Sequence, residues 1–133
     1  MQTKIALITI LTDHVPGMVQ FYRDALGFQV AVDLGQYVEL ENEGVRFAIC
    51  DRDIMEKATH HAGYRDTRKG QSFELAFPCD TPDDLDQSFE FILRHGATSI
   101  QPPSSMPWGQ RTAFFADPEG YIHELFSELQ NKL

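Results

Sequence analysis

The fold is decided by the stretch Asp117-Pro118-Glu119-Gly120-Tyr121-Ile122-His123-Glu124-Leu125, together with Met106-Pro107-Trp108-Gly109-Gln110-Arg111 just before it. The pattern predicts an aromatic loop, a strand, a tight turn and a final strand. Turns favour Asp as a cap, Pro for its fixed φ and Gly for its tolerance of φ > 0. In the final strand Ile122, Glu124 and Phe126 share one face, and Tyr121, His123 and Leu125 share the other. Glu124 is therefore a carboxylate on an apolar strand face, which indicates either a sheet-edge surface group or part of a pocket.

The composition indicates one globular domain of 133 residues, because 42% hydrophobic residues suffice for an ordinary core. The formal net charge of −9 argues against nucleic acid and against anionic membranes as partners. It leaves cationic or neutral small molecules as the easier ligands.

Two cysteines, Cys50 and Cys79, lie far apart without CxxC spacing, which predicts free thiols in a reducing compartment. Residues 1–4 lead directly into a strand-like run, so no signal peptide is expected, and no apolar run reaches membrane-spanning length. We therefore expect a cytoplasmic protein.

The first half of the chain reads as one strand, one helix and three strands. Residues 5–11 form an apolar strand pattern, residues 15–26 have helical spacing, and Gly27 is a typical helix stop. Residues 28–32, 36–41 and 45–50 are predicted strands, and residues 42–44 (Asn-Glu-Gly) are a hairpin turn.

The second half repeats this order. Residues 72–77 are a predicted strand, Thr81-Pro82-Asp83-Asp84 is typical of a helix start, and Gly96 ends that helix. Strands are then predicted at 97–101, 112–116 and 121–127. Residues 51–70 are charged and are predicted to be a linker with about one helical turn. A single α+β sandwich with accidental internal similarity is the alternative, but element order, helix stops and turns all repeat.

With these elements in place, the chain resembles the vicinal oxygen chelate superfamily, which includes glyoxalase I, extradiol dioxygenases, fosfomycin-resistance enzymes and bleomycin-binding proteins. The resemblance is carried by Phe21-Tyr22-Arg23-Asp24-Ala25-Leu26-Gly27-Phe28, by Trp108-Gly109-Gln110-Arg111 and by residues 117–125. It implies an α+β fold of two βαβββ modules whose curved sheets surround a ligand cavity, and frequently a homodimer. We expect one domain over residues 1–133, with modules at about 1–50 and 71–133.

The resemblance also implies, for the enzymes of the superfamily, a divalent metal held by two residues in each module. In the second module these positions fall on Glu74 and Glu124. In the first they fall on Leu7 (or Ala6 after a shift of one) and on Ala48, and none of these can bind a metal. Two carboxylates can hold Mg²⁺ or Ca²⁺ weakly but make a poor site for Zn²⁺, Ni²⁺ or Fe²⁺. We therefore predict no metal and no cofactor.

The five histidines do not supply the missing ligands. His123 lies on the strand face opposite Glu124. His14 and His95 lie near helix ends, and His60 and His61 lie in the linker. All five histidines are expected to be exposed. Only the adjacent pair His60 and His61 stays open as a pair of ligands.

Strand parity predicts which residues face the helices and which face the ligand. The helix-covered face should carry Val38, Leu40, Phe47, Ile49, Phe73, Leu75 and Phe77. The opposite face should carry Ile5, Leu7, Tyr37, Glu39, Arg46, Ala48, Glu74, Ala76 and Glu124. Such a mixture of apolar walls and a few polar groups is typical of a small-molecule pocket.

From these faces and the Trp108 loop we predict seven ligand-binding residues: Tyr37, Glu39, Arg46, Glu74, Trp108, Arg111 and Glu124. Two alternatives stay open. Trp108 could pack in the core, and Glu74 and Glu124 could form ion pairs with Arg46 or Arg111.

The apolar first-module positions favour a metal-independent protein that binds a cationic or aromatic small molecule, similar to the bleomycin-resistance branch. The alternative is a glyoxalase-like lyase or dioxygenase with a non-standard metal site at Glu74 and Glu124. The sequence does not identify the ligand.

Overall fold

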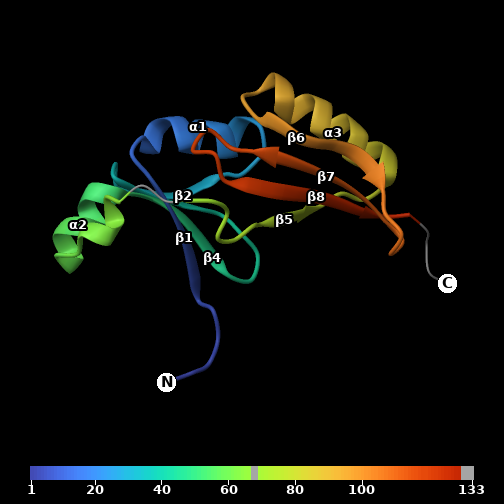
Figure 1. Ribbon diagram of the computed structural model, residues 1–133. Helices are drawn as coiled ribbons and strands as arrows, with labels where there is room; N and C mark the ends of the chain where they lie inside the picture. Colours follow the sequence, from blue (N-terminus) through green and yellow to red (C-terminus); the bar gives the residue numbers. More distant parts are fainter. Residues whose placement is uncertain (67–68, 130–133) are drawn as a thin grey trace. The chain divides into compact units, whose positions relative to one another are not determined.

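The computed structural model describes residues 1–66 and 69–129. The chain divides into two compact units, Met1–Lys69 and Gly70–Leu133 (Figure 1). Each unit contains a four-stranded sheet in which one strand pair is parallel and the other pairs are antiparallel. The predicted α+β class with two βαβββ modules is confirmed, and neither sheet closes into a barrel.

The first unit builds its sheet in the order β1-β4-β3-β2. Its elements are β1 (Leu7–Thr12), α1 (Val15–Asp24), β2 (Val30–Asp33), β3 (Tyr37–Leu40), β4 (Arg46–Asp51), α2 (Arg52–Thr59) and the 3-10 helix η1 (Ala62–Tyr64). The expected first strand at 5–11 is thus shifted, because Ile5 is 74% exposed and pairing with β4 begins at Leu7.

Helix α1 covers one face of this sheet. The imidazole of His14 accepts the Gly17 N–H at 3.1 Å and so caps the first turn, and Gly27 follows the helix with a φ of 83°. The helix buries Tyr22, whose ring lies 5.6 Å from that of Phe47 on β4 in an edge-to-face arrangement. The predicted helix-facing residues of β3 and β4 are buried as expected: Val38, Leu40, Phe47 and Ile49.

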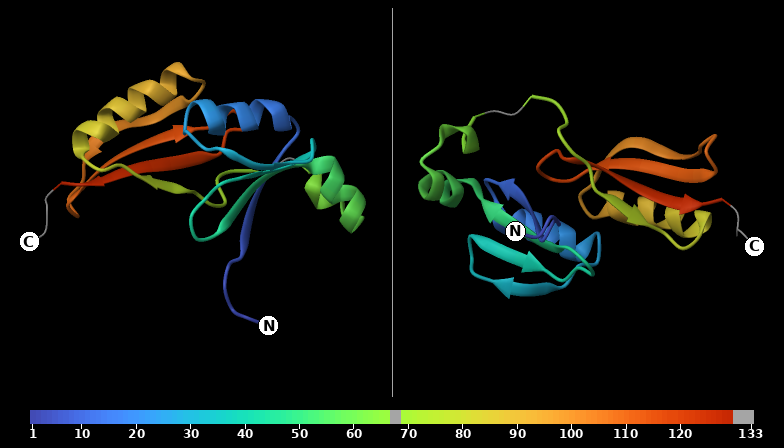
Figure 2. Two further views of the ribbon diagram at one scale, coloured as in Figure 1. Left: turned by 180° about the vertical axis from the view of Figure 1, so that it is seen from behind. Right: turned by 90° about the horizontal axis from the view of Figure 1, so that it is seen from below.

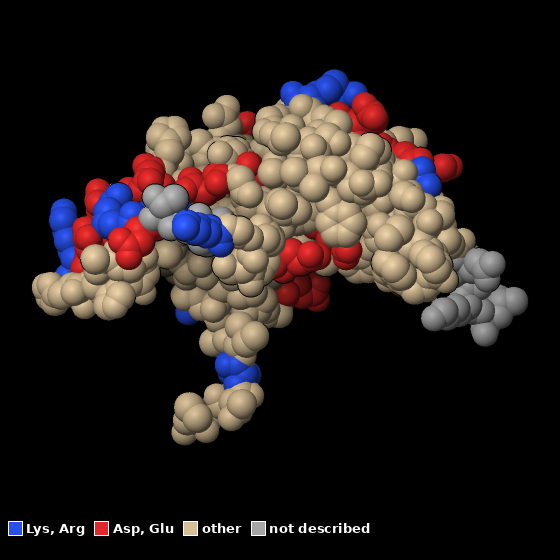
Figure 3. Space-filling view, viewed as in Figure 1, with Lys and Arg blue, Asp and Glu red and all other residues tan. Residues whose placement is uncertain are grey.

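The segment predicted to be a linker instead carries helix α2, eight residues long. The Asp51 carboxylate accepts the Asp53 N–H at 2.7 Å, and His60 ends the helix in the left-handed region with φ 55°. Arg65 then forms ion pairs with Asp13, Asp53 and Glu56. Acidic and basic side chains lie next to one another at α2 (Figure 3). The charges that suggested a linker therefore form ion pairs around the helix.

The second unit has the order β5-β8-β7-β6. Its elements are β5 (Ala76–Pro78), α3 (Pro82–Arg94), β6 (Thr98–Ser105), β7 (Gln110–Ala116) and β8 (Ile122–Glu128). Helix α3 lies along one face of the sheet (Figure 2) and buries Leu85, Phe89 and Ile92. Thr81 caps it by accepting the Asp84 N–H at 3.1 Å, as the sequence predicts.

Strand β5 is shorter than the predicted strand at 72–77. Regular pairing with β8 begins only at Ala76, opposite Glu124. Before that point side chains replace part of the backbone ladder, since the Gln71 amide donates to Ile122 O at 2.7 Å and accepts from Ile122 N at 3.2 Å.

The turn that closes β7 and β8 forms as predicted. The Asp117 carboxylate accepts the N–H groups of Glu119 and Tyr121, both at 3.0 Å, and Gly120 has a φ of 92°. The turn fixes the register of β8, which in turn decides on which face Glu124 lies. Among the described residues no helix is long and apolar enough to cross a lipid bilayer.

Candidate functional site

Two carboxylates meet on the sheet face of the second unit that is turned away from α3. Glu124 lies opposite Phe114 on β7 and Ala76 on β5, and its N–H donates to Leu75 O at 2.9 Å. Glu74 lies two residues before β5, and its charge acts on the Glu124 carboxyl, so the two side chains lie near one another. The structure therefore brings together the two carboxylates that the sequence singled out.

The environment of Glu124 disfavours its charged form. Partial burial raises the pKa of the Glu124 carboxyl above its ordinary value, and the nearby Glu74 charge raises it further. Neither carboxylate forms an ion pair with a basic side chain of residues 70–129, and Arg111 of the same unit pairs with Asp86 instead. The alternative of an ion pair with Arg111 is wrong, and an ion pair with Arg46 of the other unit stays a prediction.

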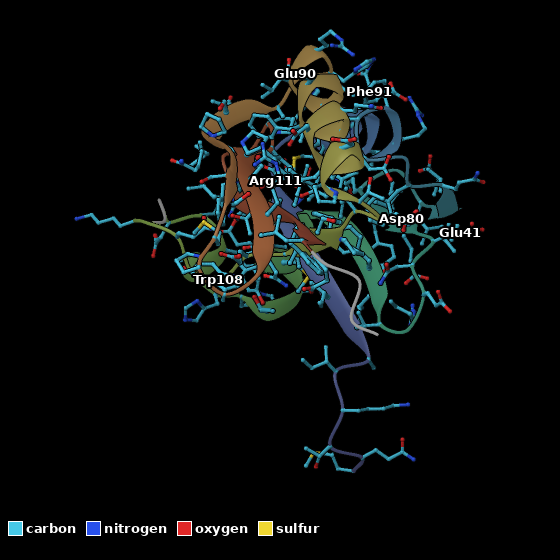
Figure 4. The ribbon with its side chains drawn as sticks, turned by 90° about the vertical axis from the view of Figure 1, so that its right-hand side faces the viewer. Glu41, Asp80, Glu90, Phe91, Trp108 and Arg111 are labelled. Atoms are coloured by element: carbon cyan, nitrogen blue, oxygen red, sulfur yellow. The ribbon has the colours of Figure 1, made fainter. Side chains whose placement is uncertain are left out.

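Trp108 lies on the turn between β6 and β7, at the end of the sheet (Figure 4). Its side chain is 63% exposed, so the core-packing alternative is wrong. The indole N–H donates to the Gln110 amide oxygen at 3.1 Å, and the Gln110 amide donates to Glu128 at 3.0 Å. Gln110 and Glu128 are register partners of the same parity as Glu124, so this chain of hydrogen bonds follows the face that carries the carboxylates.

Arg111 is turned toward the helix instead. Its guanidinium holds Asp86 of α3 with two hydrogen bonds, of 2.7 and 3.1 Å, and contacts Ser105 at 3.3 Å. Arg111 is the register partner of Ser127, which has the opposite parity to Glu124. The structure thus places Arg111 on the face opposite Glu124, and Figure 4 shows it on the strand that follows the Trp108 turn.

In the first unit Tyr37, Glu39 and Arg46 form one polar cluster on the face opposite α1. The Glu39 carboxylate accepts from Arg46 at 2.7 and 2.9 Å and from the Tyr37 hydroxyl at 3.1 Å. The hydrogen bond from Arg46 lowers the pKa of Glu39. Burial, followed by the hydrogen bond to Glu39, raises the pKa of Tyr37. One carboxylate oxygen of Glu39 thus accepts from both neighbouring side chains.

Comparison with known proteins places this arrangement in a family. Residues 4–125 match the family model described as Glyoxalase/Bleomycin resistance protein/Dioxygenase superfamily. The chain belongs to this superfamily. A search of curated proteins finds no match.

Solved structures with the superfamily fold include a glyoxalase/bleomycin resistance protein/dioxygenase family enzyme from Burkholderia phytofirmans PsJN, with TM-score 0.87 and 22% identity over 96% of this chain and 100% of that one. A lactoylglutathione lyase from Agrobacterium tumefaciens matches with TM-score 0.72 and 20% identity over 95% and 94% of the two chains. A glyoxalase/bleomycin resistance protein from Albidiferax ferrireducens T118 matches with TM-score 0.69 and 16% identity over 92% and 97%. These identities support the shared fold and no particular activity.

The donor set does not fit the divalent metal that membership of the superfamily implies for its enzymes. Leu7 and Ala48, at the positions given to ligands in the first module, offer no donor atom. Among the described residues no three His, Cys, Asp or Glu side chains group together closely enough to hold a metal. Glu74 and Glu124 alone provide two oxygen-bearing groups, which is below the usual protein donor set for a transition metal.

Four histidines of this superfamily member have local structural roles and are exposed. His14 and His61 are the N-caps of α1 and η1. His60 and His95 are the C-caps of α2 and α3. The expectation of exposure is wrong for His123, which is fully buried and bonds to Asp117. Its position three residues after the turn Gly and next to Glu124, on the core-facing parity, was the signal that could have revealed this.

One polar atom on the Glu124 face was not singled out from the sequence. The hydroxyl of Thr112 is buried and has no hydrogen-bond partner among the described residues. Thr112 is the register partner of Phe126, so it shares a face with both Glu124 and Gln110. An unsatisfied buried hydroxyl is uncommon and often marks either strain or a group that a ligand completes.

Proposed function

We propose that this protein binds a cationic, partly aromatic small molecule without a metal ion, in the manner of the bleomycin-resistance-type members of its superfamily. The observation that carries the proposal is the pair of carboxylates, Glu74 and Glu124, which form no ion pair with a basic side chain of residues 70–129. The exposed Glu74 charge repels the partly buried Glu124 carboxylate, and a bound cation relieves that repulsion.

The exposed indole supports the aromatic part of the proposal. Trp108 is oriented by Gln110, and the hydrogen bonds continue to Glu128 on the carboxylate face. Stacking of a planar cation on an indole contributes roughly 0.5–2 kcal/mol. In the first unit, Tyr37, Glu39 and Arg46 stay proposed as ligand-binding residues through their polar cluster. Arg111 stays in the proposal only as a structural support through Asp86.

We test binding through the fluorescence of Trp108, the only tryptophan in the chain. The planar cation proflavine should change the emission saturably, whereas the anion 1-anilinonaphthalene-8-sulfonate should bind less tightly. Glu74→Gln and Glu124→Gln should each weaken proflavine binding, with Glu90→Gln on the exposed surface of α3 as the charge-matched control. Tighter binding of the anion would overturn the proposed ligand charge.

The rival function is a glyoxalase-like lyase or dioxygenase that uses Glu74 and Glu124 around a hard divalent cation. The two unpaired carboxylates favour it over other enzyme classes, since oxygen donors suit such ions. Elemental analysis after expression in metal-supplemented medium separates the two functions. We expect well under one Zn, Ni, Mn or Fe per chain. A ratio near one that is lost in Glu124→Ala would establish the rival.

A homodimer is also proposed. The outer strand β2 exposes Val30, Val32 and the following Leu34, and no described strand pairs with its free edge. Such an edge is normally covered by another chain or by charged residues. A reducing, cytoplasmic setting is proposed from the free cysteines Cys50 and Cys79.

A further inference from the structure

A buried pair of side chains lies directly beneath the carboxylate face of the second unit. His123 and Asp117 are 0% and 3% exposed, and the imidazole Nε2 lies 3.3 Å from Asp117 Oδ2. Three rings close around the imidazole, with centroids 5.9 to 6.3 Å away: Phe73, Phe77 and Phe115. The proposed ligand contacts make no use of this pair.

The hydrogen bonds of His123 fix both its tautomer and its orientation. The Leu75 N–H donates to the imidazole Nδ1 at 3.1 Å, so Nδ1 carries no proton. The proton of the neutral ring is therefore on Nε2, where Asp117 accepts it. Asp117 is itself held by the N–H groups of Glu119 and Tyr121, so the tight turn anchors the imidazole.

The group that His123 holds is the backbone next to Glu74. Leu75 is bound at both of its peptide groups, since its N–H donates to His123 and its C=O accepts the Glu124 N–H at 2.9 Å. Regular pairing of β5 begins only at Ala76, so the Glu124 N–H to Leu75 C=O bond is the last contact of the backbone ladder before Glu74 among the described residues. The Gln71 amide provides a second tie, to Ile122.

We propose that His123, oriented by Asp117, is a positioning residue that holds Glu74 beside Glu124 on the ligand-binding face. The imidazole does not touch the ligand, because it lies on the opposite face of β8. It acts through Leu75, and its removal frees the segment that carries Glu74. The part of this inference that concerns the ligand rests on the proposed function, whereas the placement of Glu74 does not.

The placement is tested on the Glu124 carboxyl by ¹³C-detected NMR titration of the folded protein. Glu74→Gln should lower the pKa of Glu124 toward its ordinary value, because it removes a neighbouring charge. His123→Gln should do the same, because the longer amide reaches toward Asp117 and leaves the Leu75 N–H without an acceptor. His123→Asn should retain the wild-type titration, because its shorter side chain places an oxygen near the former Nδ1.

The control for general loosening is Leu125→Ala, which removes a buried side chain from the same face of the same strand. This variant loses stability but keeps the Leu75 bond, so its Glu124 titration should stay as in the wild type. The proposal is overturned when His123→Gln titrates like the wild type, or when Leu125→Ala shifts Glu124 as far as His123→Gln does.

Proflavine binding then tests the link to the ligand. His123→Gln should weaken the affinity by the same factor as Glu74→Gln, and the double variant should be no weaker than either single variant. Independent, multiplying losses would overturn the role of His123 in the ligand site. Absence of proflavine binding in the wild type would defeat the proposed function, and the titration would still decide whether His123 places Glu74.

Discussion

The contribution of the Thr112 hydroxyl to stability can be measured with a single isosteric substitution. In the absence of ligand it is buried without a partner among the described residues, which costs free energy relative to water. We expect Thr112→Val to raise the free energy of unfolding by about 1 kcal/mol. Urea denaturation measures this, with Thr98→Val on the exposed part of β6 as the control. A loss of stability in Thr112→Val would mean that the hydroxyl has a partner in the free protein.

At Glu124 the raised pKa has a consequence for stability that depends on pH. The folded state binds this proton more tightly than the unfolded state, so Glu124 contributes stability below the unfolded glutamate pKa of about 4.3 and loses it as pH rises through the folded pKa. Glu124→Gln does not undergo that loss.

We therefore expect the free energy of unfolding of Glu124→Gln to exceed that of the wild type at pH 7 by more than at pH 4. Denaturation series at both pH values measure the difference, and Glu90→Gln reports the general effect of removing one negative charge. A larger advantage at pH 4 than at pH 7 would contradict the raised pKa.

Among the elements, helix α3 shows best how a sequence signal becomes a measurable interaction. Thr81 accepts the Asp84 N–H, and Thr81→Ala removes that acceptor. We expect a loss of about 1 kcal/mol in the free energy of unfolding. Thr81→Ser keeps the hydroxyl and should retain most of the stability, so equal losses in the two variants would contradict a capping role.

Elements with strong local signals were predictable from the sequence, and those held by distant partners were not. The caps at Thr81 and Asp117 and the stop at Gly27 depend on neighbouring residues, so helix and turn positions were visible in the sequence. The ends of β1 and β5 depend on the strands that they pair with, and both were predicted too early. Helix α2 was missed because its charges read as solvated, whereas Arg65 forms ion pairs with two of them, Asp53 and Glu56, and with Asp13 before α1.

The same distinction applies to the candidate site. Parity alone placed Glu124 with Glu74 and put His123 on the other face. Parity could indicate that His123 faces the core, but it could not show that Arg111 bonds to Asp86 or that His123 bonds to Asp117, because these partners lie 25 and 6 residues away.

For the whole molecule, the proposed homodimer can be tested directly by measuring the mass in solution. Multi-angle light scattering at micromolar concentration should give about twice the chain mass of 15.1 kDa. Val32→Lys places a charge on the exposed edge strand and should shift the protein toward the monomer. A wild-type mass of 15.1 kDa would exclude the homodimer at that concentration.

The side-chain ties of the Glu74 segment also set an order of events in folding. Leu75 and His123 lie 48 residues apart, whereas β7 and β8 are joined by a short turn. A contact between residues distant in sequence costs more loop-closure entropy than a contact across a short turn. The β7–β8 hairpin therefore forms first, and the Glu74 segment docks onto it afterwards. In the native state the same segment should open first, and the Leu75 amide should exchange with solvent deuterium by local openings that leave the β7–β8 amides protected. The two carboxylates would thus come together late in folding and separate early in unfolding.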